Sequence, residues 1–154
     1  MGIEIERKFL VRDRSVIDGL TGIAYRQGYL SLDPARTVRV RLAGGHGYLT
    51  IKGRSTGPSR AEFEYEIPID DVESLLALCE GPLIEKTRHR IGHAGRTWEV
   101  DVFHGANDGL VVAEVEVASL DAPVDVPDWL GEEVTSDARY FNASLVRRPY
   151  GTWT

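Results

Sequence analysis

The chain has 154 residues, of which 42% are hydrophobic and 27% charged, and its formal net charge is −6 at pH 7. This composition predicts one soluble globular domain over residues 1–154. It argues against a nucleic-acid partner, because the overall field would repel a polyanion. No apolar run approaches the length of a membrane span, so no membrane association is expected. Cys79 is the only cysteine, which excludes an internal disulfide and predicts a cytoplasmic location.

The first predicted strand, residues 2–12, carries charged side chains at every second position. Successive side chains of a strand point to opposite faces, so Glu4, Glu6 and Lys8 share one face and Ile5 lies on the other. Two carboxylates and an ammonium are poorly suited to a core, but they suit a hard divalent cation next to a phosphate. One such strand is weak evidence, because an edge strand in solvent shows the same pattern.

Further along the chain the same alternation returns in strand after strand. A short turn of helix is expected at 13–19, a helix at about 70–81 and another at about 136–149. The seven further strands predicted are 24–32, 36–43, 46–53, 60–68, 84–92, 96–104 and 110–118. The charged residues that alternate with apolar ones in them are Arg39, Arg41, Lys52, Glu62, Glu64, Glu66, Lys86, Arg88, Arg90, Glu99, Asp101, Glu114 and Glu116.

Eight strands joined mostly by short turns favour an antiparallel sheet, and closure into a barrel removes its two edges. The aliphatic and aromatic residues between the charges need cover, which helices outside the barrel supply in part. The charged faces then point inward. Because buried charges persist only when they are paired or bound to metal, we expect a wet lumen that binds a metal ion and a small anion. The predicted class is α+β, mainly β: an eight-stranded antiparallel closed barrel with a charged lumen and a few flanking helices.

Taken in order, these segments resemble the CYTH family, also called triphosphate tunnel metalloenzymes. The resemblance spans about residues 3–145. The matching segments are Glu4-x-Glu6-x-Lys8, Arg26-Gln27-Gly28-Tyr29-Leu30, Arg39-x-Arg41, Leu49-Thr50-Ile51-Lys52, Glu62-x-Glu64, Glu85-Lys86-Thr87-Arg88, Glu99-x-Asp101, Glu114-x-Glu116, Glu132-Glu133-Val134-Thr135 and Arg139-Tyr140-x-Asn142. The resemblance implies a tunnel open at both ends and an enzyme that catalyses hydrolysis or transfer on a triphosphate, with Mg²⁺ or Mn²⁺.

Within that framework the charged residues receive expected roles. The expected metal ligands are Glu4, Glu6, Glu114 and Glu116, since an oxygen-only set suits Mg²⁺ or Mn²⁺ rather than zinc. The expected partners of the phosphates are Lys8, Arg39, Arg41, Lys52, Lys86 and Arg88. Glu62, Glu64 and Asp101 are expected to support the site as further ligands or as charge balance. The chemistry itself is assigned to Glu4, Glu6, Lys8 and Lys52.

The expected reaction is metal-dependent hydrolysis of inorganic triphosphate to diphosphate and phosphate. Three alternative enzymes use the same site: an adenylate cyclase of class IV type, a thiamine triphosphatase and a nucleoside triphosphatase. A non-catalytic sensor of phosphate or polyphosphate is the alternative outside enzymes, and an ion-pair network that holds strands in register is the structural one. The oligomeric state stays open, with a homodimer as one alternative.

Overall fold

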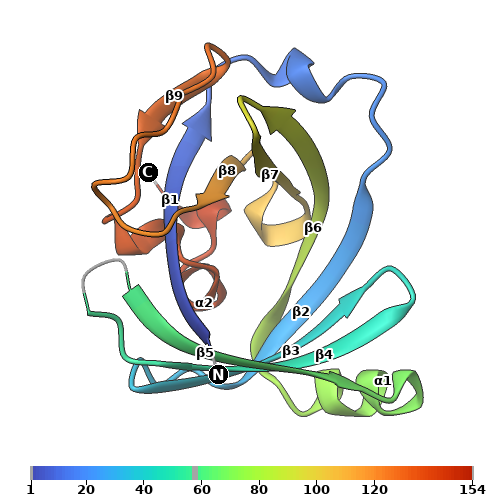
Figure 1. The fold of residues 1–154 in the computed structure, drawn as a ribbon. Coiled ribbons are helices and arrows are strands. Elements are labelled where there is room, and N and C mark those ends of the chain that lie inside the picture. Colours follow the sequence, from blue (N-terminus) through green and yellow to red (C-terminus); the bar gives the residue numbers. More distant parts are fainter. Residues whose placement is uncertain (1, 57–58, 154) are drawn as a thin grey trace.

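The computed structural model describes residues 2–56 and 59–153, which form a curved sheet with short helices around it (Figure 1). The strands are β1 (Gly2–Val11), β2 (Ile23–Ser31), β3 (Arg36–Ala43), β4 (His46–Gly53), β5 (Ser59–Ile67), β6 (Glu80–His93), β7 (Arg96–Phe103), β8 (Val111–Glu116) and β9 (Leu130–Glu133). The α-helices are α1 (Ile69–Ala77) and α2 (Asn142–Arg147), and the 3₁₀ turns are η1 (Arg14–Ile17), η2 (Gly105–Asn107), η3 (Ala138–Tyr140) and η4 (Tyr150–Thr152).

The sheet closes into a barrel of eight antiparallel strands. Its order is β5-β4-β3-β2-β6-β7-β8-β1, and β1 pairs back onto β5. The closing contact is short, because only residues 2–5 of β1 pair with residues 59–62 of β5. The rest of β1 pairs with β8, where Glu6 lies opposite Glu116 and Lys8 opposite Glu114. The predicted eight-stranded barrel is therefore confirmed.

The ninth strand was not predicted. β9 has four residues and pairs with β1 outside the barrel closure. The adjoining backbone continues this contact, since Val134 N donates to Lys8 O at 2.8 Å. A segment of this length shows no readable alternation, so its strand character comes from its partner and not from its own sequence.

Two predicted helices differ in their boundaries. α1 ends at Ala77, before the expected end at about residue 81, and Gly81 and Pro82 belong to the start of β6. Pro68 takes the N-cap position, and Asp70 and Asp71 lie in the first turn. The helix expected over 136–149 is divided into η3 and the short α2. The helical turn expected at 13–19 is confirmed as η1.

Apolar side chains cover the barrel from outside and fill one of its ends. Val72 and Leu76 of α1 pack on Val40 of β3. At the barrel end near α2, the alternation changes from charged to apolar, and Leu145 and Val146 meet side chains of the strands there. These strand residues are Leu10, Tyr29, Ile84, Phe103 and Val112. α2 is thereby seated at this end, next to the lumen (Figure 1).

Among the described residues, no helix is long and apolar enough to span a membrane.

Candidate active site

The inner faces of the strands enclose one cavity of about 820 Å³. It reaches residues at both ends of the barrel, with Arg54 and Arg147 near one end and Arg90 and His46 near the other. The predicted site residues that line it are Glu4, Glu6, Lys8, Arg39, Arg41, Lys52, Glu62, Glu64, Lys86, Arg88, Glu114 and Glu116. The thirteenth predicted site residue, Asp101, is buried behind the lining. With Asp101 included, the structure thus brings together residues from seven strands. Their inward positions are those that the alternation of charge predicted.

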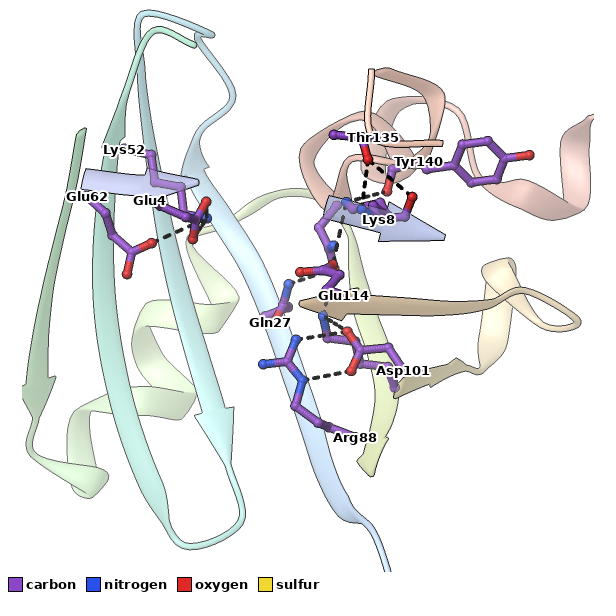
Figure 2. A network of polar contacts seen from close by, with 12 residues as sticks. Glu4, Lys8, Gln27, Lys52, Glu62, Arg88, Asp101, Glu114, Thr135 and Tyr140 are labelled. Carbon is purple, nitrogen blue, oxygen red and sulfur yellow. Dashed lines mark hydrogen bonds and ion pairs between the residues drawn. The ribbon is translucent and has the colours of Figure 1, made fainter. Parts of the chain in front are cut away.

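Asp101 anchors two of the cations. Its carboxylate lies 2.7 Å from Lys86 Nζ and accepts two hydrogen bonds from Arg88, at 2.8 and 2.9 Å (Figure 2). Burial raises the pKa of Asp101, but Lys86 and Arg88 outweigh it and hold the pKa below its usual range. Burial in turn lowers the pKa of Lys86 to about 7, against the opposing attraction of Asp101. Asp101 therefore serves as the counter-charge that allows two cations to stay inside the barrel.

Lys8 lies between the carboxylates and the C-terminal segment. Its Nζ is 3.5 Å from Glu114 Oε1 and donates to the carbonyl oxygen of Tyr140 at 3.3 Å. Its backbone N donates to Thr135 Oγ1 at 3.0 Å (Figure 2). Burial lowers the pKa of Lys8, but the charges of Glu114 and Glu6 raise it by more than burial lowers it. The pKa therefore lies above its usual value, and the ammonium keeps its charge. Thr135 and Tyr140, which lie outside the eight barrel strands, therefore orient the Lys8 ammonium inside the barrel.

The carboxylates of the lumen come in two close pairs. Burial and the charge of Glu114 raise the pKa of Glu6 to about 9. Burial also raises the pKa of Glu114, but Lys8 and a hydrogen bond from Glu6 bring it far below its usual range. In the second pair, the neighbouring Glu4 carboxylate and burial raise the pKa of Glu62 to about 7. Each pair therefore tends to retain one proton while no cation lies between its members.

Lys52 links the second pair to the phosphate-binding side. Its Nζ donates to both oxygens of Glu4, at 2.9 and 3.0 Å, and lies 3.7 Å from Glu62 Oε2 (Figure 2). Burial raises the pKa of Glu4, but hydrogen bonding with Glu62 and the charge of Lys52 hold it below its usual range. This ion pair spans the short closure between β1 and β5.

The arginines of β3 face the same space with unused binding capacity. Arg39 donates to Thr50 Oγ1 at 3.1 Å and lies 3.6 Å from Glu64 Oε2, yet its buried Nε has no hydrogen-bond partner among the described residues. Burial, together with the nearby charges of Arg39 and Arg88, lowers the pKa of Arg41 to about 9. An anion in the lumen would satisfy the Nε donor and relieve this repulsion.

The donor set fits a hard divalent ion that shares its coordination with a substrate. All candidate ligands are carboxylate oxygens, and a dication beside them would displace the protons that Glu6 and Glu62, the neighbour of Glu4, hold. Among residues 2–56 and 59–153, however, no three His, Cys, Asp or Glu side chains form a ready-made metal cage. This agrees with Mg²⁺ chemistry, in which one or two carboxylates usually act together with waters and phosphate oxygens.

Two neutral residues of the site received no role from the sequence. Asn142 Oδ1 accepts from Lys86 Nζ at 3.0 Å and from Gln27 Nε2 at 3.1 Å. Gln27 is fully buried, and its Oε1 accepts from Arg41 Nε at 2.7 Å. Neither residue is charged, so the alternation of charge did not select them. The available signals were the place of both residues in segments that resemble the CYTH family and the inward position of Gln27 between Tyr25 and Tyr29.

Comparison with known proteins decides the family. The family model of the CYTH domain matches residues 2–150. This chain belongs to the CYTH family. The relatives of this CYTH protein include the inorganic triphosphatase of Acetivibrio thermocellus, 50% identical over 97% of both chains, and that of Nitrosomonas europaea, 42% identical over 92% of this chain and 95% of the other. Among solved structures, the inorganic triphosphatase NE1496 is 39% identical with a TM-score of 0.68, and the match covers 93% of this chain and 97% of that one. The predicted family membership is confirmed, and triphosphatases of this family generally depend on a divalent metal.

Proposed function

We propose that this CYTH protein hydrolyses inorganic triphosphate to diphosphate and phosphate, with Mg²⁺ or Mn²⁺ as the cofactor. The observation that carries the proposal is the lumen cavity, in which carboxylate pairs face a set of cations and Arg39 Nε has no partner among the described residues. Both curated relatives are named inorganic triphosphatases, which supports the same substrate.

The cations bind the phosphate chain. Arg39, Arg41 and Arg88 offer planar forks that match phosphate oxygens, and a triphosphate brings the several negative charges that these neighbouring guanidinium groups require. The lysines supply point charges along the same path: Lys8, Lys52 and Lys86. Because the neighbouring arginines repel one another, a bound anion would offset this repulsion.

The carboxylates hold the metal ion. We assign Glu4, Glu6, Glu114 and Glu116 as its ligands, with Glu62 and Glu64 balancing Lys52 and Arg39. When bound, the ion neutralises phosphate oxygens and favours in-line attack of water on the terminal phosphorus. Asp101 acts as the counter-charge of Lys86 and Arg88.

The remaining chemistry belongs to side chains at the border of the two sets. Glu4 or Glu6 accepts the proton of the attacking water, since both face the lumen. Lys8 borders both the carboxylates and the phosphate path, and Lys52 or Lys86 stabilises the charge that develops on the leaving diphosphate. Because the lone cysteine cannot form an internal disulfide, we keep the expectation that the enzyme is cytoplasmic.

The test is phosphate release from inorganic triphosphate, ATP and thiamine triphosphate, each with Mg²⁺, Mn²⁺ or EDTA. We expect metal-dependent release that is fastest on inorganic triphosphate. Formation of cyclic AMP and diphosphate from ATP would identify a cyclase instead. Binding of triphosphate without turnover in any metal would leave a sensor and overturn the proposal.

A further inference from the structure

Asn142 reaches from outside the barrel into its most cationic region. It is the first residue of α2 and lines the cavity. Its side-chain oxygen lies within hydrogen-bond distance of Lys86 Nζ and Gln27 Nε2. α2 is seated by Leu145 and Val146, which pack against the apolar end of the barrel. The backbone that carries Asn142 is therefore held in place independently of the hydrogen bonds that its side chain makes.

The donors around Asn142 fix the orientation of its amide. A lysine ammonium and an arginine guanidinium have only donors, so the atoms that face Lys86 and Arg41 must be amide oxygens. Gln27 therefore turns its Oε1 to Arg41 and its Nε2 to Asn142, which in turn presents Oδ1 to Lys86. One chain of hydrogen bonds thus runs from a cation on β3 to a cation on β6.

Lys86 needs such a second partner. Its side chain is fully buried, and Asp101 Oδ2 attracts the Nζ from one side at 2.7 Å. Asn142 Oδ1 holds the same nitrogen from another direction at 3.0 Å. A second carboxylate at this place would cancel the charge that the phosphate chain needs, whereas an amide accepts the hydrogen bond without adding charge.

We propose that Asn142 is a positioning residue that fixes Lys86 Nζ for contact with the triphosphate, with Gln27 locking the amide in the required orientation. The inference rests on the proposed function, in which Lys86 is a partner of the phosphates. It adds a residue from the C-terminal helix to a site whose assigned charged residues all come from strands.

The test is a double-mutant cycle between Asn142→Leu and Lys86→Met. Two quantities are measured: kcat and KM with inorganic triphosphate, and its Kd in EDTA by calorimetry. Leucine keeps the branched shape and the number of heavy atoms of asparagine but removes the acceptor, so we expect kcat/KM to fall roughly ten- to one-hundredfold and binding to weaken in parallel. In the Lys86→Met background the same exchange should change either quantity by no more than about twofold. Equal effects in both backgrounds would overturn the proposal.

Two further variants separate positioning from a general loss of structure. Asn142→Asp retains the acceptor oxygen, so kcat should recover while the added charge raises KM. Asn107→Leu is the matched control, because Asn107 is also buried and its Oδ1 accepts from Tyr150 N at 2.8 Å, away from the lumen. It should lower the melting temperature and leave kcat and KM unchanged. If Asn142→Leu behaves in the same way, Asn142 has only a structural role and the proposal fails.

The cycle also distinguishes this proposal from the function on which it rests. If the wild-type protein binds triphosphate without cleaving it, and the Kd values of the cycle show coupling between Asn142 and Lys86, the hydrolase is refuted and the positioning role is retained. Rapid hydrolysis by the wild type, with no coupling between the Asn142 and Lys86 exchanges, would support the hydrolase and refute the positioning role. Absence of both binding and turnover in the wild type would overturn both.

Discussion

Replacing Glu6 by glutamine should stabilise the metal-free protein while it abolishes turnover. Burial and Glu114 raise the pKa of Glu6 from 4.5 to about 9. Between these two pH values the folded protein therefore keeps a proton that the unfolded chain has released, and stability falls as the pH rises. At about 1.4 kcal/mol per pH unit, the loss between pH 4.5 and pH 7 is about 3 kcal/mol. Glutamine carries no such penalty, and its Nε2 can donate to Glu114 as the protonated acid does.

The expected gain is large enough to measure by thermal unfolding. For a chain of this size 1 kcal/mol corresponds to about 2–4 °C, so the melting temperature in EDTA at pH 7 should rise by roughly 6–12 °C. At pH 5 the difference should nearly vanish. Glu80→Gln, at an exposed glutamate on β6, is the control and should change neither stability nor activity. The reasoning is refuted if Glu6→Gln is no more stable than wild type at pH 7, or if its advantage is the same at pH 5.

Three further predictions follow from the contacts of the lumen. Asp101→Ala leaves Lys86 and Arg88 without their buried counter-charge, so urea denaturation should show a loss of about 3–5 kcal/mol, and unchanged stability would contradict this account. Mn²⁺ should displace the protons that Glu6 and Glu62 retain up to about pH 9 and 7, so its affinity should rise with pH and its calorimetric heat should depend on the buffer; a heat independent of the buffer would count against the pairs. Arg39→Lys retains the charge but loses the fork and its unpartnered Nε, so KM for triphosphate should rise about tenfold at an unchanged melting temperature, and an unchanged KM would remove Arg39 from the binding site.

The barrel could be predicted because charge alternates with the period of a strand. Glu4, Glu6 and Lys8 already showed one inward face, and the same pattern on later strands left closure as the consistent solution. β9 lacked this signal, since its short segment is held by the backbone of β1. The end of α1 was also missed, because Gly81-Pro82 suits both a helix end and the irregular start of a strand, and only packing selects between them.

The site could be predicted as a set of inward charges but not as a set of pairs. Which carboxylate meets Glu6 depends on the stagger of β1 against β8, and this register is a property of the closed barrel. Asp101 was expected in the lumen, whereas the structure buries it behind Lys86 and Arg88. Asn142 approaches through the packing of a helix, which no strand periodicity describes. The catalytic and ligand roles of the lumen residues stay predictions that the proposed experiments test.

The most direct test of the central claim is ³¹P NMR of inorganic triphosphate incubated with the protein and Mg²⁺. In the proposed function, the carboxylate pairs and the facing cations promote one metal-dependent cleavage of the terminal phosphoryl group. We therefore expect equal amounts of phosphate and diphosphate to appear, and no change in EDTA. Triphosphate that stays intact with Mg²⁺ and with Mn²⁺, or that is cleaved equally well in EDTA, would contradict the account.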